Sequence, residues 1–77
     1  MNKKDFQIAL GQRIRQLRED RNISQTELGI LCNIERTNMS RIETGNTNPS
    51  SYLLYVISEK LDVKASELLN FNLTSEK

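Results

Sequence analysis

Apolar residues in the first third of the chain recur at steps of three and four, which is the spacing of a helix with one buried face. Gly11 interrupts this segment. Because glycine weakens a helix interior by about 1 kcal/mol relative to alanine, its presence indicates a close crossing with another helix. Asp5 can cap the start of this helix, and Asn22 can end it. The apolar row consists of Phe6, Leu10, Ile14 and Leu17.

The segment 23–45 contains the signals of two short helices joined by a tight turn. Ser24 and Glu27 have the spacing of a capping box, in which each side chain accepts a hydrogen bond from the other residue's backbone N–H. Ile23 and Leu28 have the spacing of the accompanying hydrophobic staple. This combination predicts that the first of the two helices begins directly after Ser24.

The second of these helices is predicted to begin after Glu35, with Ile34 and Met39 at the staple spacing. Glu35 is a weaker cap than Ser, Thr or Asp. Asn33 lies between the two helices, and asparagine is the non-glycine residue that most readily adopts positive φ, so it can turn the chain steeply. Two helices joined in this way form a helix-turn-helix, whose second helix can enter the major groove of DNA.

The two sides of this second helix differ in chemistry. Met39 and Ile42 are three residues apart and are expected to face the core. The opposite side is short, polar and rich in hydrogen-bonding groups. A guanidinium can bridge O6 and N7 of guanine, an amide can pair with adenine, and a threonine methyl can lie against that of thymine. We therefore expect this side to read base edges, through Arg36, Thr37, Asn38 and Arg41.

The remaining third of the chain predicts two more helices. Gly45 can end the preceding helix, and Asn48 as cap with Pro49 at the first helical position indicates where the next one starts. Asp62 is expected to end this helix, and a final short helix follows after Val63. The apolar row of the longer helix is Leu54, Ile57 and Leu61.

The same region carries more apolar and aromatic surface than a small monomer needs to bury. Such a surplus favours self-association, and the alternative is that the tail packs back on its own domain, against the longer helix. The residues expected at a dimer interface are Tyr52, Leu53, Val56, Leu69 and Phe71.

The length of 77 residues allows one domain, because it is too short for two hydrophobic cores. We assign residues 1–5 to a flexible N-terminal arm, residues 6–70 to the helical domain and residues 71–77 to a tail. The formal net charge is only +1. Any binding of nucleic acid must therefore depend on where the charges lie rather than on their sum.

Composition also limits the chemistry. The single Cys32 cannot form an intrachain disulfide, and no apolar run has the length of a membrane or signal segment, which fits a reducing cytoplasm. Cys32 is interpreted as a small core residue, with a redox sensor as the alternative. The sequence has no histidine, no metal-loop spacing of carboxylates and no nucleophile–base pair. We therefore expect no enzymatic activity, no metal and no cofactor.

Four stretches of the sequence resemble the Xre/Cro family of helix-turn-helix regulators, which includes phage repressors and restriction–modification controller proteins. The stretches are LGQRIRQLRED from Leu10, ISQTEL from Ile23, MSRIETGNTNPS from Met39 and LDVKASELL from Leu61. The resemblance implies an all-α fold, a compact five-helix bundle like the DNA-binding domain of lambda repressor. The chain departs from the family at Gly29, where alanine is usual, at Asn33, where glycine is usual, and at the Glu35 cap.

Further site residues follow from spacing and from this resemblance. Arg18 and Glu43 lie at the edges of the apolar rows of their helices and are expected to pair. In the family, such a bridge ties the first helix to the third. The resemblance also implies contacts with DNA phosphates from the helix-turn-helix and from the loop that follows it. These residues are Gln25, Ser40, Asn46, Thr47 and Asn48.

The function implied by the resemblance is that of a sequence-specific transcriptional regulator, which binds an inverted repeat in double-stranded DNA as a homodimer. The alternative is a protein-interaction module or antitoxin that binds a partner protein. Repression and activation are both open, and activation would involve a contact with RNA polymerase, for which Glu27 is one candidate. The run Glu35, Arg36 and Thr37 leans toward the controller type.

Overall fold

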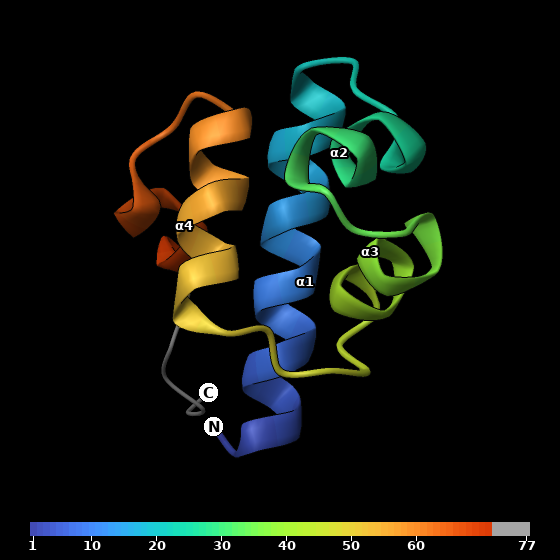
Figure 1. Ribbon diagram of the computed structural model, residues 1–77. Helices are drawn as coiled ribbons and strands as arrows, with labels where there is room; N and C mark the ends of the chain where they lie inside the picture. Colours follow the sequence, from blue (N-terminus) through green and yellow to red (C-terminus); the bar gives the residue numbers. More distant parts are fainter. Residues whose placement is uncertain (72–77) are drawn as a thin grey trace.

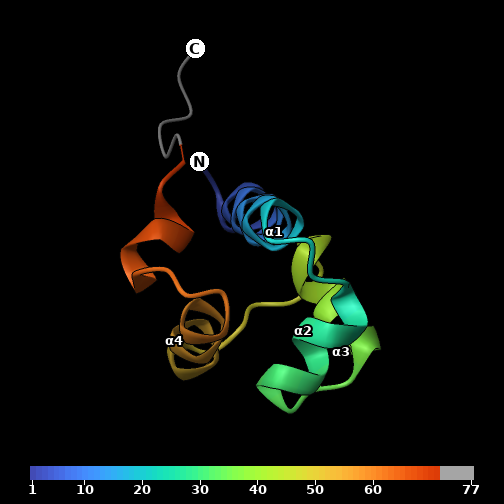
Figure 2. The ribbon, with the colours of Figure 1, turned by 90° about the horizontal axis from the view of Figure 1, so that it is seen from above.

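The computed structural model describes residues 1–71 of the chain, and this part contains helices and connecting loops without strands. The long helix α1 is flanked by the α2–α3 pair on one side and by α4 with a short 3₁₀ helix, η1, on the other (Figure 1). Seen along α1, these groups stand around a shared interior (Figure 2). The elements are α1 (Lys3–Asp20), α2 (Gln25–Cys32), α3 (Arg36–Glu43), α4 (Ser51–Lys60) and η1 (Ala65–Leu69).

The core lies where the predicted apolar rows meet. Three members of the row on α1 are buried, whereas Phe6 at its start is only partly buried. On α4, Ile57 and the following Leu61 are buried, and Leu54 packs partly buried against them. The buried apolar residues are Leu10, Ile14, Leu17, Leu28, Cys32, Met39, Ile42, Ile57, Leu61 and Leu68.

Three predicted non-glycine helix stops are confirmed by backbone geometry. Asn22, Asn33 and Asp62 all adopt left-handed conformations, with φ of 56°, 60° and 58°. A short polar side chain that can bond locally makes this region accessible to Asn and Asp. Gly45 follows α3 with φ of 79°, as expected for a residue that ends a helix.

Two predicted helix starts were wrong. Asn2 rather than Asp5 caps α1, because its side-chain oxygen accepts a hydrogen bond from the backbone N–H of Asp5 at 2.8 Å. Residues 3–5, assigned to a flexible arm, therefore lie in the first turn of α1. Ser50 caps α4 by accepting from the N–H of Leu53 at 3.1 Å, so Asn48 and Pro49 precede the helix. In both cases a better placed Asn or Ser side chain satisfies the N–H three residues ahead.

The fifth helix is a 3₁₀ helix rather than an α-helix, so the described part contains four α-helices and one 3₁₀ helix. Lys64 at its start provides no side-chain cap. Leu68 nevertheless enters the core, and Arg13 of α1 donates hydrogen bonds to the carbonyl and carboxylate of Glu67, each at 2.8 Å. Side-chain contacts, rather than helix length, thus hold this segment on α1. Within residues 1–71, no helix is both long enough and apolar enough to cross a membrane.

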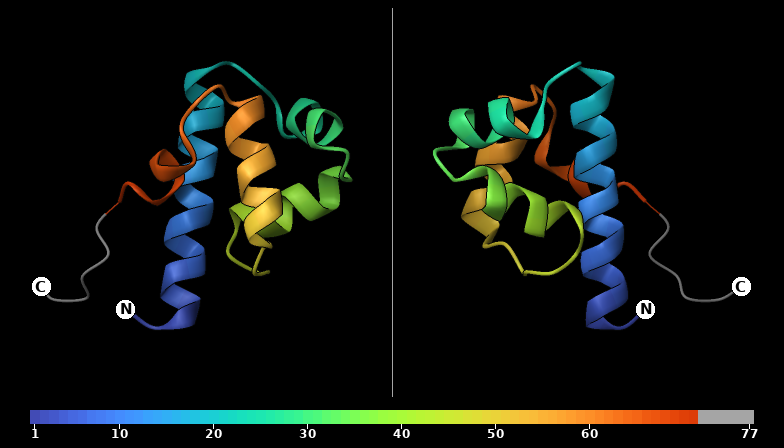
Figure 3. Two further views of the ribbon diagram at one scale, coloured as in Figure 1. Left: turned by 60° about the vertical axis from the view of Figure 1, so that its left-hand side comes forward. Right: turned by 90° about the vertical axis from the view of Figure 1, so that its right-hand side faces the viewer.

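The expected close crossing at Gly11 is between α1 and α3. A Cβ atom added at Gly11 would lie 2.4 Å from the carbonyl oxygen of Ile42 and 2.6 Å from that of Glu43. The two backbones are therefore in direct contact, and only glycine fits. Figure 3 shows α3 beside α1.

Replacing Gly11 by alanine is expected to lower the free energy of unfolding by about 1–3 kcal/mol, because the added methyl must separate α1 from α3. A decrease in the free energy of unfolding would be informative, because at an exposed helix position alanine instead raises it by about 1 kcal/mol relative to glycine. Urea denaturation of Gly11→Ala, beside Gln12→Ala at the exposed neighbouring position, measures it. A Gly11→Ala protein as stable as the wild type would contradict the crossing.

Candidate nucleic-acid interface

The capping box at the start of α2 is confirmed. The hydroxyl of Ser24 accepts from the N–H of Glu27, and a carboxylate oxygen of Glu27 accepts from the N–H of Ser24, both at 3.0 Å. At the other end of α2, the N–H of Ile34 donates to the carbonyl of Gly29 at 2.9 Å. A Cβ at Gly29 would lie only 2.9 Å from the carbonyl oxygen of Ile34. The tight turn therefore accounts for glycine at a position where the family usually has alanine.

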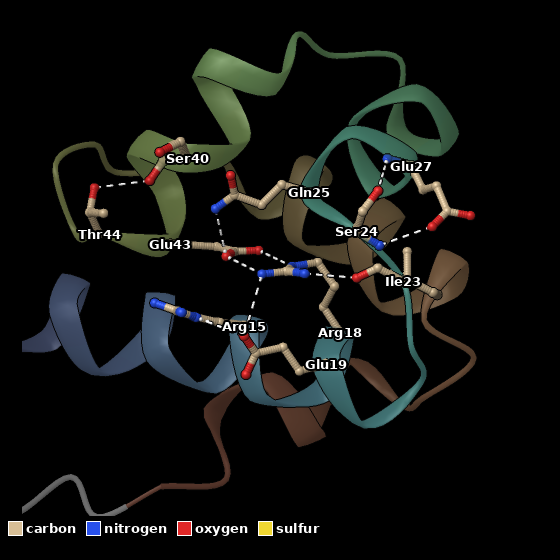
Figure 4. A network of polar contacts seen from close by, with 10 residues as sticks. All are labelled: Arg15, Arg18, Glu19, Ile23, Ser24, Gln25, Glu27, Ser40, Glu43 and Thr44. Atoms are coloured by element: carbon tan, nitrogen blue, oxygen red, sulfur yellow. Dashed lines mark hydrogen bonds and ion pairs between the residues drawn. The ribbon is translucent and has the colours of Figure 1, made fainter.

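A buried polar network holds α3 against the rest of the domain (Figure 4). The guanidinium of Arg18 pairs with the carboxylate of Glu43 through Nε–Oε2 at 2.7 Å and Nη2–Oε1 at 3.0 Å. Its remaining nitrogen, Nη1, donates to the carbonyl of Ile23 at 2.7 Å. Both residues are buried, with 8% and 5% of their surface exposed. The structure thus brings together the two residues expected to pair.

The ion pair favours the charged form of Arg18. The hydrogen bonds from Arg18 to Glu43 raise the pKa of the guanidinium above its usual value, and desolvation opposes them only in part. Arginine is already charged at every physiological pH. Arg18 therefore contributes a fixed positive charge to the pair.

Gln25 has a contact that the sequence analysis missed. Its side-chain amide, at the start of α2, donates to Oε1 of Glu43 at 2.9 Å, which extends the network to a third helix (Figure 4). An amide nitrogen has two N–H donors, so a second donor is left by this bond. Contact of Gln25 with a DNA phosphate stays a prediction, now for a residue that is also anchored to α3.

The outer side of α3 presents the four residues expected to read bases. Arg36, Thr37, Asn38 and Arg41 are all exposed. Within residues 1–71, the hydrogen bonds and ion pairs of the protein involve none of their side chains. Glu35, which precedes them, makes no side-chain cap bond and leaves the first turn of α3 open. The donors and acceptors of this side are therefore available to an outside ligand.

A hollow of about 240 Å³ joins this face to the loop before α4. Asn38 and Arg41 of α3 and Thr47 of the loop line it together with apolar side chains. Asn48 is exposed beyond it, and Ser40 is half-buried within α3. Two of the expected base-reading residues and one of the expected phosphate-contacting residues thus line the same hollow. The hollow is lined by Ile34, Asn38, Arg41, Ile42, Thr47, Pro49 and Leu53.

The loop after α3 is anchored to α1 by Lys4 and Gln7, a role that was not predicted from the sequence. Lys4 donates from Nζ to the carbonyl of Gly45 at 2.8 Å and to Oδ1 of Asn46 at 3.0 Å. Gln7, which is buried, donates from Nε2 to the same Gly45 carbonyl at 3.1 Å. Asn46 in turn donates to the hydroxyl of Thr44 at 3.0 Å. The Asn46 side chain, expected to contact phosphate, is therefore already engaged in positioning the loop.

The surface expected to form a dimer is only partly free. Tyr52 is 73% exposed and Leu69 is also exposed, whereas Leu53 and Val56 pack partly buried against the core. Phe71 lies against Phe6 of α1, with ring centroids 5.8 Å apart. The start of the tail thus packs on its own domain, against α1 rather than α4.

Two further features bear on the alternative interpretations, a protein-interaction module and a redox-sensing Cys32. Ile30 and Leu31 at the end of α2 are exposed, a second apolar patch that the sequence analysis missed. Cys32 is buried, and desolvation raises the pKa of its thiol, so the reactive thiolate is disfavoured. Among residues 1–71, no group of three or more Cys, Asp or Glu side chains is arranged to hold a metal ion.

Comparison with known proteins matches the chain to helix-turn-helix proteins. Residues 9–68 match the family model described as a helix-turn-helix domain. The control protein C.BamHI of Bacillus amyloliquefaciens is 37% identical over 68 residues, covering 87% of this chain and 84% of that protein. The crystal structure of the restriction–modification controller protein C.AhdI from Aeromonas hydrophila superposes with a TM-score of 0.77 at 31% identity, covering 79% of this chain and 92% of the other.

A third similar structure contains nucleic acid. It is the crystal structure of SinR, a master regulator for biofilm formation, in complex with DNA. The TM-score is 0.72 at 37% identity, and the match covers 79% of this chain and 98% of the SinR chain.

Removing one partner of the buried pair is expected to be costly. Arg18→Met leaves the carboxylate of Glu43 buried without its counter-charge and should lower the free energy of unfolding by about 3–5 kcal/mol. The double variant Arg18→Met/Glu43→Leu should lose less than Arg18→Met alone, because no charge stays buried. Urea denaturation of the variants gives both values.

The matched control is Arg15→Met on the same helix. Arg15 pairs with Glu19 at 3.0 Å, but both side chains are about half exposed or more, so the expected loss is below about 1 kcal/mol. Equal losses for Arg15→Met and Arg18→Met would contradict a special role for the buried pair.

Proposed function

The chain belongs to the helix-turn-helix family of Xre/Cro-type regulators, and from this premise we propose that it is a sequence-specific regulator that binds an inverted-repeat operator as a homodimer. The observation that carries the proposal is the free outer side of α3. Four exposed polar side chains lie there without partners in the described part of the protein, on a helix whose inner side is fixed to α1 and α2. These are the residues Arg36, Thr37, Asn38 and Arg41.

The base-reading step follows from the chemistry of these side chains. Arg36 and Arg41 each offer a planar donor fork that matches O6 and N7 of guanine. Asn38 offers the donor and acceptor that match adenine, and the methyl of Thr37 suits thymine. The similarity to SinR, whose structure contains DNA, supports DNA as the ligand.

Phosphate contacts would set the register of α3 in the groove. Gln25 and Ser40 belong to the helix-turn-helix, and Thr47 and Asn48 belong to the loop after α3, where Thr47 lines the hollow. Such contacts fix position without carrying sequence information. Asn46 contributes to this register by holding the loop through its bonds to Lys4 and Thr44.

The homodimer is proposed from the exposed apolar surface on α4 and η1. Tyr52 and Leu69 are exposed, and Leu53 and Val56 extend this surface into partly buried positions. A two-fold dimer places its two recognition helices about one turn of DNA, roughly 34 Å, apart. Each subunit then needs only a short reading face. Similarity to the controller proteins C.BamHI and C.AhdI supports the controller type among regulators.

A protein partner is the second candidate function. Ile30 and Leu31 form an apolar patch on α2, apart from the proposed dimer surface. Glu27, considered for a contact with RNA polymerase, is exposed beside the start of the same helix, although its carboxylate also serves the capping box. A partner that binds at this patch would also lie close to α3, because Ile30 lines a hollow together with Glu35 and Asn38.

Arg36→Ala is expected to lower specific DNA affinity by about 1–3 kcal/mol and to relax the preference at one base pair of each half-site. Selection of the purified wild type and variant against random duplex DNA measures both effects. The control is Arg15→Ala, which removes an exposed arginine from α1 without touching α3. If Arg36→Ala weakened all sequences equally, or no more than Arg15→Ala, the base-reading assignment would fail.

The dimer surface has its own test. Tyr52→Glu places a charge on the proposed interface and should shift the protein toward the monomer in sedimentation equilibrium. Ile30→Glu is the matched control, because Ile30 and Tyr52 are each 73% exposed but lie on different helices. Dimer loss in Ile30→Glu, with Tyr52→Glu unaffected, would move the interface to α2.

A further inference from the structure

Lys4 carries a positive charge that the fold holds in one place. Its ammonium donates two hydrogen bonds, to the carbonyl of Gly45 and to Oδ1 of Asn46, both in the loop after α3. Both acceptors are uncharged, and the ion pairs found among residues 1–71 do not include Lys4. An ammonium has three N–H donors, so one donor and the whole charge are left by these bonds.

The position of this charge follows from how the loop is built. Gly45 sits directly on α1, since a Cβ there would lie 2.7 Å from Cα of Ile8. The buried Gln7 bonds the same carbonyl as Lys4. The start of α1 and the loop are therefore one unit, and Figure 3 shows the loop passing beside the N-terminal half of α1. The ammonium of Lys4 is bonded to Asn46. The next residue along the loop, Thr47, lines the hollow beside α3.

We propose that Lys4 is a phosphate-contacting residue, which grips the DNA backbone beside the groove that α3 reads. This inference rests on the proposed DNA-binding function and extends its contact surface to the first turn of α1. A phosphodiester oxygen is the ligand that an ordered, unpaired ammonium fits best, as a point-charge donor. The net charge of the chain is only +1, so a cation held in position accounts for a larger share of the attraction than it would in a strongly basic protein.

Lys3 offers a matched comparison. It precedes Lys4 in the same turn of α1 and is also exposed, but none of the side-chain hydrogen bonds of residues 1–71 involves it. Lys3→Gln and Lys4→Gln therefore each remove one positive charge from neighbouring residues. The ammonium of Lys4 is held on the loop by hydrogen bonds, whereas that of Lys3 is not. Lys4→Arg keeps the positive charge but replaces the compact ammonium by a planar guanidinium.

The experiment measures DNA affinity over a range of salt concentrations, on a duplex selected by the wild type and on a scrambled duplex. Lys4→Gln should make the plot of log affinity against log salt shallower by about 0.9, the contribution of one phosphate contact. The loss should be nearly the same for both duplexes, because phosphate contacts carry no sequence information. Lys4→Arg should keep the wild-type slope, and Lys3→Gln should change it by less than half as much as Lys4→Gln.

Three results would overturn the inference. Weaker binding by Lys4→Gln at an unchanged slope would make Lys4 a tether of the loop only. Equal changes of slope in Lys3→Gln and Lys4→Gln would show a diffuse charge effect without a specific contact. Wild-type protein that is folded but enriches no sequence from random duplex DNA at low salt would overturn the proposed function itself, which the other two results leave standing.

Discussion

The ion pair between Arg18 and Glu43 is the interaction on which the arrangement of the helices depends. Two charges with so little exposed surface are costly to remove from water, and only a complete set of partners offsets that cost. Arg18 uses all three guanidinium nitrogens, and Gln25 provides a further donor to Glu43. No buried side-chain nitrogen or oxygen in residues 1–71 lacks a hydrogen-bond partner. Because the network is satisfied only in one geometry, it fixes α1, the start of α2 and the end of α3 together.

Two further contacts complete the attachment of α3 to α1. The backbones touch at Gly11, about two turns before Arg18, and the loop that follows α3 is bonded by Lys4 and Gln7 at the start of α1. Most of the length of α1 thus serves as a support for the inner side of α3 and its loop. A reading helix held in this way loses little freedom on binding, which favours affinity from a small contact surface. The outer side of α3 is left free for a ligand.

Much of the fold could be predicted from the sequence because it is set by local chemistry. The row that buries Ile14, the capping box at Ser24 and the left-handed stop at Asn33 each depend on neighbours a few residues away. Two helix starts were misplaced by a few residues, since several Asn, Ser and Asp side chains competed for the same role near Asn2 and near Ser50. The 3₁₀ form of the last helix depends on how Leu68 reaches the core, which no local pattern gives.

The candidate site was predictable to a similar depth. The exposure of the polar residues of α3 was predictable because a short amphipathic helix separates its faces, and the pairing of Arg18 with Glu43 because each borders an apolar row. The anchoring role of Lys4 and Gln7 was missed, because their partners are about forty positions away in the sequence. The exposure of Ile30 and Leu31 was missed as well, since α2 is apolar on more than one side and the sequence does not show which side is covered.

The most direct test of the central claim, that the outer side of α3 binds DNA while its inner side stays fixed, is an NMR titration. The ¹⁵N-labelled protein is titrated with a duplex that it selects, and amide shifts are followed residue by residue. The largest changes are expected from Arg36 to Arg41 and in the loop at Thr47 and Asn48, with little change around Ile14 and Leu17 in the core. Changes confined to the patch at Ile30 and Leu31, with α3 unaffected, would contradict it.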